Sequence, residues 1–346
     1  RATLMDDDKE MFLTGSPQGE PGLREAIRGY LHSARGVNCT ADQIIIGAGS
    51  EYLMMLLTQI LGTSRTIAME NPTYRQAYRV FESLGCQMKP VEMDAHGMNV
   101  RLLEESGADI AYVMPSHQYP MGVVMPVKRR QELLSWAGRG EKRYLIEDDY
   151  DSEFRYRGKP VPALQGMDIQ GKVIYMGTFS KSIAPAIRVG YLVLPAPLLA
   201  VYKRKCGFYA STVSRIDQKI IYQFLTEGHY ERHLNRMRAI YKGKHDVLMS
   251  ELKTLGTEFI VQGEYAGLHV LLKYRKAGME TWLVEEAAKA RVGVYGISGF
   301  LIAPLANQKE KCFSTVVLGY ARLNEDQIRE GIRRLAAAWK CSRPCP

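Results

Sequence analysis

The chain has 346 residues, 46% of them apolar, and 46 Lys and Arg against 37 Asp and Glu, which gives a formal net charge of +9. A chain of this length and composition can bury a large core and is long enough for two domains. The sequence has neither a signal peptide nor an apolar stretch long enough to span a membrane. We therefore expect a cytoplasmic protein without a membrane partner, in which the basic charge gives at most an auxiliary attraction to DNA.

Strand and helix patterns alternate along the first two thirds of the chain. After an N-terminal arm and a helix over 21–34, the expected strands cover 44–47, 66–70, 109–114, 144–148, 173–177 and 190–194. This alternation predicts an α/β fold with a mainly parallel sheet, of the seven-stranded type, covered by helices on both faces. A helical region over 214–255 follows, and strands at 268–272 and 315–319 with a closing helix after Asp326 indicate a smaller α+β domain.

These elements predict three parts of the chain. Residues 1–40 are expected to form an N-terminal arm and helix associated with the smaller domain. Residues 41–250 would form the large domain, and residues 251–346 the smaller C-terminal α+β domain.

A glycine turn follows the first strand, in Gly47-Ala48-Gly49-Ser50-Glu51. Strand, glycine turn and helix in this order present backbone N–H groups to an anion, and Ser50 is expected to cap the helix. Many such turns bind nothing, so the motif by itself is weak evidence for a phosphate site.

An apolar strand ends in carboxylates at Glu147-Asp148-Asp149-Tyr150. Ligands of open α/β sheets bind at the carboxyl ends of the strands, which makes Asp148 and Tyr150 candidate site residues. The alternative is that Asp148 and Asp149 only cap the next turn.

Lys181 carries the most informative pattern, because it closes an apolar strand between hydroxyl residues and precedes Arg188 by seven positions. A Schiff base needs a primary amine that can lose its proton, while an arginine fork with Thr178 and Ser180 can bind a phosphate. This combination predicts pyridoxal 5′-phosphate (PLP). PLP also needs an acid beside its ring nitrogen, for which Asp148 is the candidate, and Tyr150 could hydrogen-bond the ring's phenolic oxygen.

Several ordered motifs carry a family resemblance. They are Gly15-Ser16-Pro17-Gln18-Gly19, Gly47-Ala48-Gly49-Ser50, Glu70-Asn71-Pro72-Thr73-Tyr74, Ser116-His117-Gln118-Tyr119-Pro120, Asp148-Asp149-Tyr150-Asp151-Ser152-Glu153-Phe154 and Ser180-Lys181, with the segment 227–241. Together they resemble the aminotransferase-like domain of the MocR/GabR transcription regulators, over nearly the whole chain. The Ser-Lys pair with its arginine is common to fold-type I aminotransferases, whereas the segments 116–120 and 148–154 are typical of the regulators.

The resemblance implies roles for individual residues. Lys181 would hold PLP as a Schiff base, Asp148 would face the ring nitrogen and Tyr150 the O3′ oxygen. The phosphate and ring contacts would come from Ser50, Glu51, Thr178, Ser180, Arg188 and, by stacking, Tyr74. Tyr74 could instead be a helix-entry residue that packs in the core.

Two departures from catalytic aminotransferases weaken the case for turnover. Tyr119 stands where those enzymes have an asparagine beside the cofactor, and Val317 stands where they have the arginine that binds a substrate carboxylate. We therefore expect an effector-binding and oligomerisation domain of a MocR-type regulator, with a PLP-dependent aminotransferase as the alternative. A scaffold that has kept the fold without the cofactor is disfavoured by Lys181, Asp148 and Arg188.

The resemblance also implies partners. A small amine or amino acid would form an external aldimine with PLP in place of Lys181 and so trigger a conformational change, in a pocket near His117, Tyr119 and Gln76. The protein would form a homodimer and would bind DNA through an N-terminal helix-turn-helix module that these residues do not include. The first residue, Arg1, would then follow such a module.

No metal site is expected. His229 and His233 have metal-ligand spacing on a helix but lack a third ligand, and Cys341 and Cys345 are too few for zinc.

Overall fold

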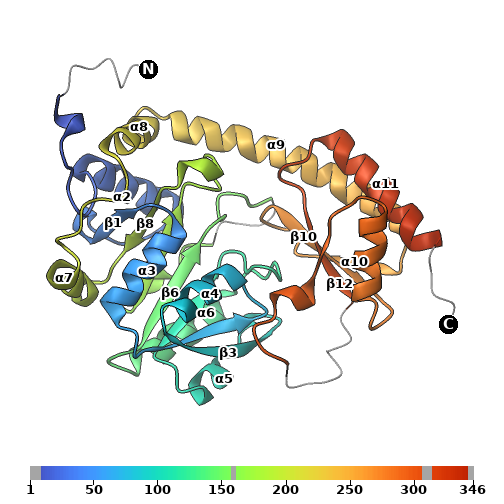
Figure 1. The fold of residues 1–346 in the computed structure, drawn as a ribbon, viewed down its shortest axis with the longest axis horizontal. Helices are drawn as coiled ribbons and strands as arrows, with labels where there is room; N and C mark the ends of the chain where they lie inside the picture. The colour runs from blue at the N-terminus through green and yellow to red at the C-terminus, as the bar shows by residue number, and fades with distance from the viewer. Residues whose placement is uncertain (1–8, 157–160, 306–313, 342–346) are drawn as a thin grey trace.

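The computed structural model describes residues 9–156, 161–305 and 314–341, and its main feature is an eight-stranded sheet (Figure 1). The strand order is β1-β8-β7-β6-β5-β2-β3-β4. The strands are β1 (Ile44–Gly47), β2 (Thr66–Asn71), β3 (Gln87–Asp94), β4 (Gly97–Met98), β5 (Ile110–Val113), β6 (Tyr144–Asp149), β7 (Val173–Thr178) and β8 (Gly190–Val193). Pairs from β3 through β2, β5 and β6 to β7 are parallel, whereas β8 and β4 pair antiparallel to their neighbours. The expected mainly parallel α/β sheet is thus confirmed.

Helices cover both faces of this sheet. The first face carries α3 (Ser50–Leu61), α4 (Arg75–Ser83) and α7 (Ala196–Lys205), whose apolar side chains pack on those of the strands. The second face carries α5 (Val100–Glu105), α6 (Val127–Gly138), α2 (Pro21–Arg35) and α8 (Arg215–Thr226). Short 3₁₀ helices η1 (Lys9–Phe12), η2 (Ala41–Gln43), η3 (Gln165–Met167) and η4 (Pro185–Ile187) lie between these elements.

The packing of α2 corrects one expectation. Its apolar residues Leu23, Ile27 and Leu31 are fully buried against strands β1, β7 and β8, in one cluster with residues of α8. Residues 21–35 therefore pack on the large sheet rather than with the smaller domain, because their apolar stripe matches the sheet's second face. The three domain boundaries themselves stay a prediction.

A second, four-stranded antiparallel sheet forms the other core. Its order is β11-β12-β10-β9, and its elements are β9 (Phe259–Gln262), β10 (His269–Tyr274), β11 (Tyr295–Gly296), β12 (Thr315–Gly319), α10 (Glu280–Lys289), α11 (Glu325–Cys341), η5 (Lys253–Leu255) and η6 (Ile297–Phe300). Figure 1 shows α9 (His229–Leu252) running from the large sheet to this smaller one. Tyr230 and Leu234 at its start pack in the large core, and Leu248 and Leu252 near its end pack in the small one.

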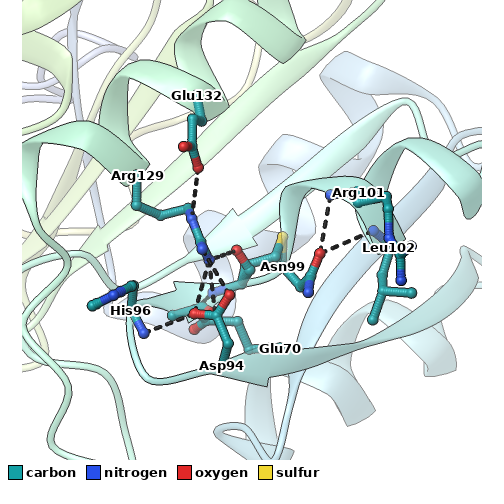
Figure 2. A network of polar contacts seen from close by, with 10 residues as sticks. Glu70, Asp94, His96, Asn99, Arg101, Leu102, Arg129 and Glu132 are labelled. Atoms are coloured by element: carbon teal, nitrogen blue, oxygen red, sulfur yellow. Dashed lines mark hydrogen bonds and ion pairs between the residues drawn. The ribbon is translucent and has the colours of Figure 1, made fainter.

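Four strands, β3, β4, β9 and β11, were missed by the pattern of apolar runs. Strand β3 lies next to the two-residue β4 at the end of the sheet, and most of its side chains are exposed or half-buried, so its residues include Lys, Glu and Pro. Arg129 of α6 stabilises this edge (Figure 2): its Nη2 lies 2.7 Å from Asp94 Oδ2, and its Nε donates to Glu132 Oε2 at 2.9 Å. Edge strands need little apolar surface, and their position depends on such tertiary contacts.

Within the described residues, no helix has the length and apolar character needed to cross a membrane.

Candidate functional site

The predicted site residues meet at one edge of the large sheet. Strands β5, β6 and β7 are parallel, and β1 runs in the same direction because both β1 and β7 are antiparallel to β8. Their carboxyl ends therefore lie at the same edge, where ligands of α/β sheets bind. The glycine turn follows β1, the 115–123 loop follows β5, Asp148 to Tyr150 end β6, and Lys181 follows β7.

Asp148 and Asp149 point to opposite faces of β6. The Tyr112 hydroxyl donates to Asp148 Oδ2 on the first face, in a buried contact. On the second face, Asp149 Oδ2 accepts from Arg35 Nε at 2.8 Å and from Tyr175 at 2.6 Å. Both carboxylates are therefore buried strand residues with tertiary partners, not caps of the following turn.

The environment of Asp148 is unusual for a carboxyl. Burial, assisted by the charges of Asp149 and Asp151, raises its pKa from 3.8 to about 7, while the Tyr112 hydroxyl opposes the rise. By contrast Asp149 has a pKa below its usual range despite burial, because Arg35 and Tyr175 stabilise its charge. A cationic group beside Asp148 would restore its ionised form.

An anion cradle lies at the start of α3. Gly49 has φ +88°, and a Cβ at this position would lie 2.6 Å from Arg188 Nη2, so the guanidinium packs directly on the turn. The expectation that Ser50 caps the helix is wrong, since Ser50 is the first helical residue and Gly49 the N-cap, and no side chain caps this end. The N-terminus of α3 thus favours an anion, although the Glu51 N–H already donates to the Glu51 carboxylate.

Arg188 forms an ion pair with Glu51 of the first turn of α3. Both side chains are partly exposed, and Arg188 adopts a left-handed backbone conformation with φ 47°. Glu51 therefore occupies the guanidinium that the sequence assigned to a phosphate.

The hydroxyl residues beside Lys181 differ in whether their side chains already form hydrogen bonds. Thr178 Oγ1 accepts from Ser180 N at 3.1 Å and donates to Val189 O at 3.4 Å, so its hydroxyl orders its own segment. Among the described residues, buried Ser180 Oγ has no hydrogen-bond partner. Lys181 is exposed. An orphaned hydroxyl beside an exposed lysine and a nearby arginine fits a phosphorylated cofactor.

An aromatic cluster borders this edge, and we define it as Tyr74, Tyr119, Tyr150, His269 and Phe300. Tyr119 is its centre: its ring meets the other four edge-on at centroid distances of 5.0 to 6.4 Å. Tyr74 stands at the N-terminal entry of α4, as one of the two interpretations of the sequence predicted. It is 36% exposed and therefore is not a core residue.

His117 is buried at 1% exposure behind this cluster. Its Nδ1 lies 2.9 Å from Asp151 Oδ2 and 3.0 Å from the Tyr150 hydroxyl oxygen. It packs on Gly267, which has φ +76° and where a Cβ would lie 1.9 Å from the imidazole. His117 thus supports the Tyr150 hydroxyl from a buried position.

The smaller sheet turns an apolar face toward the site. Val317 is buried with Leu271 and Ile297, and Met121 and Phe300 pack against them. His269, on the same face as Leu271, approaches Pro120 O with Nε2 at 2.9 Å. Burial, His117 and Lys181 lower its pKa to about 3, so its imidazole is neutral at physiological pH.

A segment around η6 is hydrogen-bonded to the start of α4. Asn71 Nδ2 donates to Ala303 O at 2.8 Å, its Oδ1 accepts from Ile302 N at 3.0 Å, and Thr73 N donates to Phe300 O at 3.0 Å. Gln76, one of the expected pocket residues, is exposed in the first turn of α4. These contacts join the two parts of the molecule beside Tyr74.

Sequence reasoning missed Tyr112, Asp151 and His269 as neighbours of the site. Tyr112 lies within an apolar strand and His269 at the start of one from the distant smaller sheet, so neither had a local signal. Asp151 stood in a recognised motif, and only its partner was unknown.

The histidines of the 229/233 pair each have a partner of another kind in the structure. His229 Nε2 pairs with Glu227 at 3.2 Å, and His233 Nε2 lies 2.9 Å from Ser182 O. Cys39, Cys86 and Cys206 are free thiols, whereas the side chains of Cys341 and Cys345 lie outside the described residues. Across the described ranges, no group of three His, Cys, Asp or Glu side chains could hold a metal ion.

Comparison with known proteins decides the family, since the family model described as aminotransferase class I and II matches residues 1–335. The chain belongs to this family. It is also 40% identical over 332 residues to an uncharacterized HTH-type transcriptional regulator, YdeL of Bacillus subtilis, covering 96% of this chain and 70% of that protein. The probable rhizopine catabolism regulatory protein MocR of Rhizobium meliloti is 32% identical, with 93% of this chain and 64% of that protein covered.

Within the aminotransferase family, the chain is therefore similar along nearly its whole length to part of HTH-type transcriptional regulators, MocR among them. Its fold is that of fold-type I: an archaeal alanine:glyoxylate aminotransferase superposes with a TM-score of 0.85 at 25% identity, over 99% of this chain and 86% of that one. PLP is the cofactor of this family. The orphaned Ser180 hydroxyl, the glycine cradle at Gly49 and the buried acid Asp148 fit its phosphate and ring nitrogen.

Proposed function

We propose that this chain holds PLP at Lys181 and senses a small amine, as the effector-binding and oligomerisation domain of a MocR-type transcription regulator. The supporting observation is the convergence of Lys181, Asp148 and the Arg188–Gly49 cradle on one sheet edge, beside an apolar face that contains Val317. When bound, PLP supplies an aldehyde that condenses reversibly with primary amines.

The roles of the residues follow from their positions. Asp148 would pair with the ring nitrogen, because a positive partner offsets the burial that raises its pKa. Arg188, Ser180 and the N-terminus of α3, through the Ser50 and Glu51 positions of its first turn, would bind the phosphate, and Arg188 would exchange the Glu51 carboxylate for it. Thr178 would position Ser180 by its hydrogen bonds to the same segment.

The ring would be held from two further sides. Tyr74, which is partly exposed at the entry of α4, would stack on it. Tyr150 would donate to the ring's phenolic oxygen, with His117 and Asp151 holding its hydroxyl in place.

The effector would displace Lys181 from the cofactor. Tyr119 and Gln76 are the candidate contacts, with His117 acting through Tyr150. Val317 cannot bind a carboxylate, and its neighbours Leu271 and Ile297 are apolar. A conformational response would change the hydrogen bonds between Asn71 and the 300–303 segment, which join the two sheets' domains. An effector shifts this equilibrium only by its differential affinity for the two states.

The intact regulator would act in the cytoplasm as a homodimer, with DNA bound by its helix-turn-helix part.

Absorption spectroscopy tests this function. PLP-loaded protein is titrated with a panel of amines and amino acids, in parallel with Lys181→Ala and with assays for 2-oxo acid. A saturable spectral change that needs Lys181 and gives no 2-oxo acid supports the sensor.

A second function has structural support, since solved aminotransferases superpose on nearly the whole chain. Multiple-turnover formation of 2-oxo acid would establish that function instead. A protein that binds no PLP would refute both.

A further inference from the structure

A cavity of about 260 Å³ lies between α2, the 151–155 segment and the middle of α9. Tyr30, Arg35, Glu153, Arg155 and Arg238 line it. The lining includes none of the three residues proposed to hold the cofactor's aldehyde, ring nitrogen and phosphate. This cavity is therefore distinct from the proposed cofactor contacts, and it adjoins them through His117 and Asp151, which border it together with Ser116.

Arg155 is the unusual residue of the cavity. Its side chain is half-buried, its Nε is buried without a partner, and within the described residues its guanidinium forms no hydrogen bond or ion pair. Burial and then the charge of Arg35 lower its pKa. A partly buried cation beside another cation is unfavourable unless an anion compensates it.

The neighbouring acids each have a partner other than Arg155. Asp149 pairs with Arg35, and Asp151 Oδ2 lies 2.9 Å from His117 Nδ1. Glu153 accepts from the Tyr30 hydroxyl at 3.1 Å, and burial followed by the charge of Asp149 raises its pKa to about 7. Glu153 therefore carries only part of a negative charge at physiological pH.

The other arginines do not remove the surplus of positive charge. Arg35 donates to Asp149, to Ser116 Oγ at 2.7 Å and to Val161 O at 3.2 Å. Arg238 donates through Nε to Glu153 O at 2.8 Å, a neutral acceptor. Arg155 and Arg238 thus leave the cavity with cationic groups that lack a carboxylate.

We propose that this cavity binds a small oxyanion, the carboxylate or phosphate group of a metabolite, against Arg155. An arginine fork matches both groups in geometry and charge. The volume exceeds what one water needs and lies just below the usual range of ligand pockets, which suits a small molecule.

A ligand in this cavity would be connected to Tyr150. Asp151 and His117 border the cavity, and His117 Nδ1 is 3.0 Å from the Tyr150 hydroxyl oxygen. The bound anion would therefore change the surroundings of the cofactor's phenolic oxygen, and cofactor and anion would influence each other's affinity reciprocally. This connection rests on the proposed function, whereas the anion site itself does not.

Titration calorimetry with inorganic phosphate and with succinate, at constant ionic strength, tests the site on PLP-saturated protein. Arg155→Met is compared with wild type and with Arg139→Met, a control on an exposed arginine that pairs with Glu104. Wild type and control are expected to bind one anion per chain, and Arg155→Met is expected to lose at least tenfold in affinity. The preference for phosphate over succinate, or the reverse, shows whether the site recognises a phosphate or a carboxylate group. The cofactor's absorption is expected to shift on anion binding in wild type and in Arg139→Met, which keep Arg155, and not in Arg155→Met.

Equal affinity in Arg155→Met, or no binding at millimolar anion, would overturn the site. Thermal unfolding checks that the variant folds, and Arg155→Lys, which keeps the charge but not the fork, is expected to lose severalfold. Anion binding without a change in absorption would overturn the connection to Tyr150. If the chain takes up no PLP, calorimetry on the cofactor-free Arg188→Met protein still tests the anion site. This variant lacks the arginine proposed to bind the cofactor phosphate, so that arginine cannot account for the anion binding that is measured.

Discussion

Asp148→Asn should stabilise the cofactor-free protein, and increasingly so as the pH rises. The carboxyl is 6% exposed, and burial raises its pKa from 3.8 to about 7. A raised pKa means that the folded state favours the protonated acid. Its contribution to stability is therefore complete below about pH 4 and is lost as the pH rises through 7.

The size of the effect follows from the shift. Roughly three pKa units at ~1.4 kcal/mol each give at most about 4 kcal/mol of lost stability above pH 8. Asparagine is neutral at every pH and has nearly the same volume, and its carbonyl oxygen can still accept from the Tyr112 hydroxyl. The substitution therefore removes the charge without leaving a cavity.

Urea denaturation of the cofactor-free proteins between pH 4.5 and 8.5 measures this. We expect the variant's advantage in free energy of unfolding to widen by about 3 kcal/mol across that range, while the exposed-site control Asp326→Asn shows a constant difference. A gap that stays constant or narrows would mean that Asp148 is ionised in the folded protein, and the argument from burial would be wrong. The same variant should bind PLP more weakly, because the ring nitrogen loses its anion.

Three further substitutions test other contacts. Gly267→Ala would press on His117 at a φ of +76° and should lower the free energy of unfolding by about 3 kcal/mol in thermal unfolding. Gly107→Ala, whose φ is +67° and whose added Cβ meets no atom, should cost only ~1 kcal/mol, and equal losses would exclude the contact with His117. Glu51→Gln should tighten PLP binding two- to fivefold in fluorescence titrations at low salt, because the exposed Arg188–Glu51 pair that PLP must break contributes roughly 0.4–1 kcal/mol. Weaker binding would show that the Glu51 side chain contributes to binding of the phosphate. Arg129→Met should lower the free energy of unfolding by about 1–3 kcal/mol in urea denaturation, because the 94–98 edge loses its contacts with the guanidinium. Arg139→Met should lower it by less than ~1 kcal/mol, and the reverse order would contradict the network of Figure 2.

Local patterns in the sequence were sufficient for the framework. The apolar runs that became β1, β2, β5, β6, β7 and β8 are buried on both faces, so their composition marks them without knowledge of their neighbours. The glycine at position 49 and the spacing of Lys181 and Arg188 are likewise local, because a turn and the residues next to it are set by a few consecutive dihedral angles. The parallel order then brings these segments to one edge.

Tertiary packing decided what each polar side chain contacts. Two adjacent acids in β6 look equivalent in sequence, yet alternation across the strand gives Tyr112 to Asp148 and Arg35 to Asp149. His269 reaches the site from 88 residues beyond Lys181, and β3 depends on Arg129 rather than on apolar residues. Sequence thus determined which chemical groups stand at the edge of the sheet, because backbone preferences are local. Only the fold determined their partners and charges, because hydrogen bonds and burial join segments that are distant in the chain.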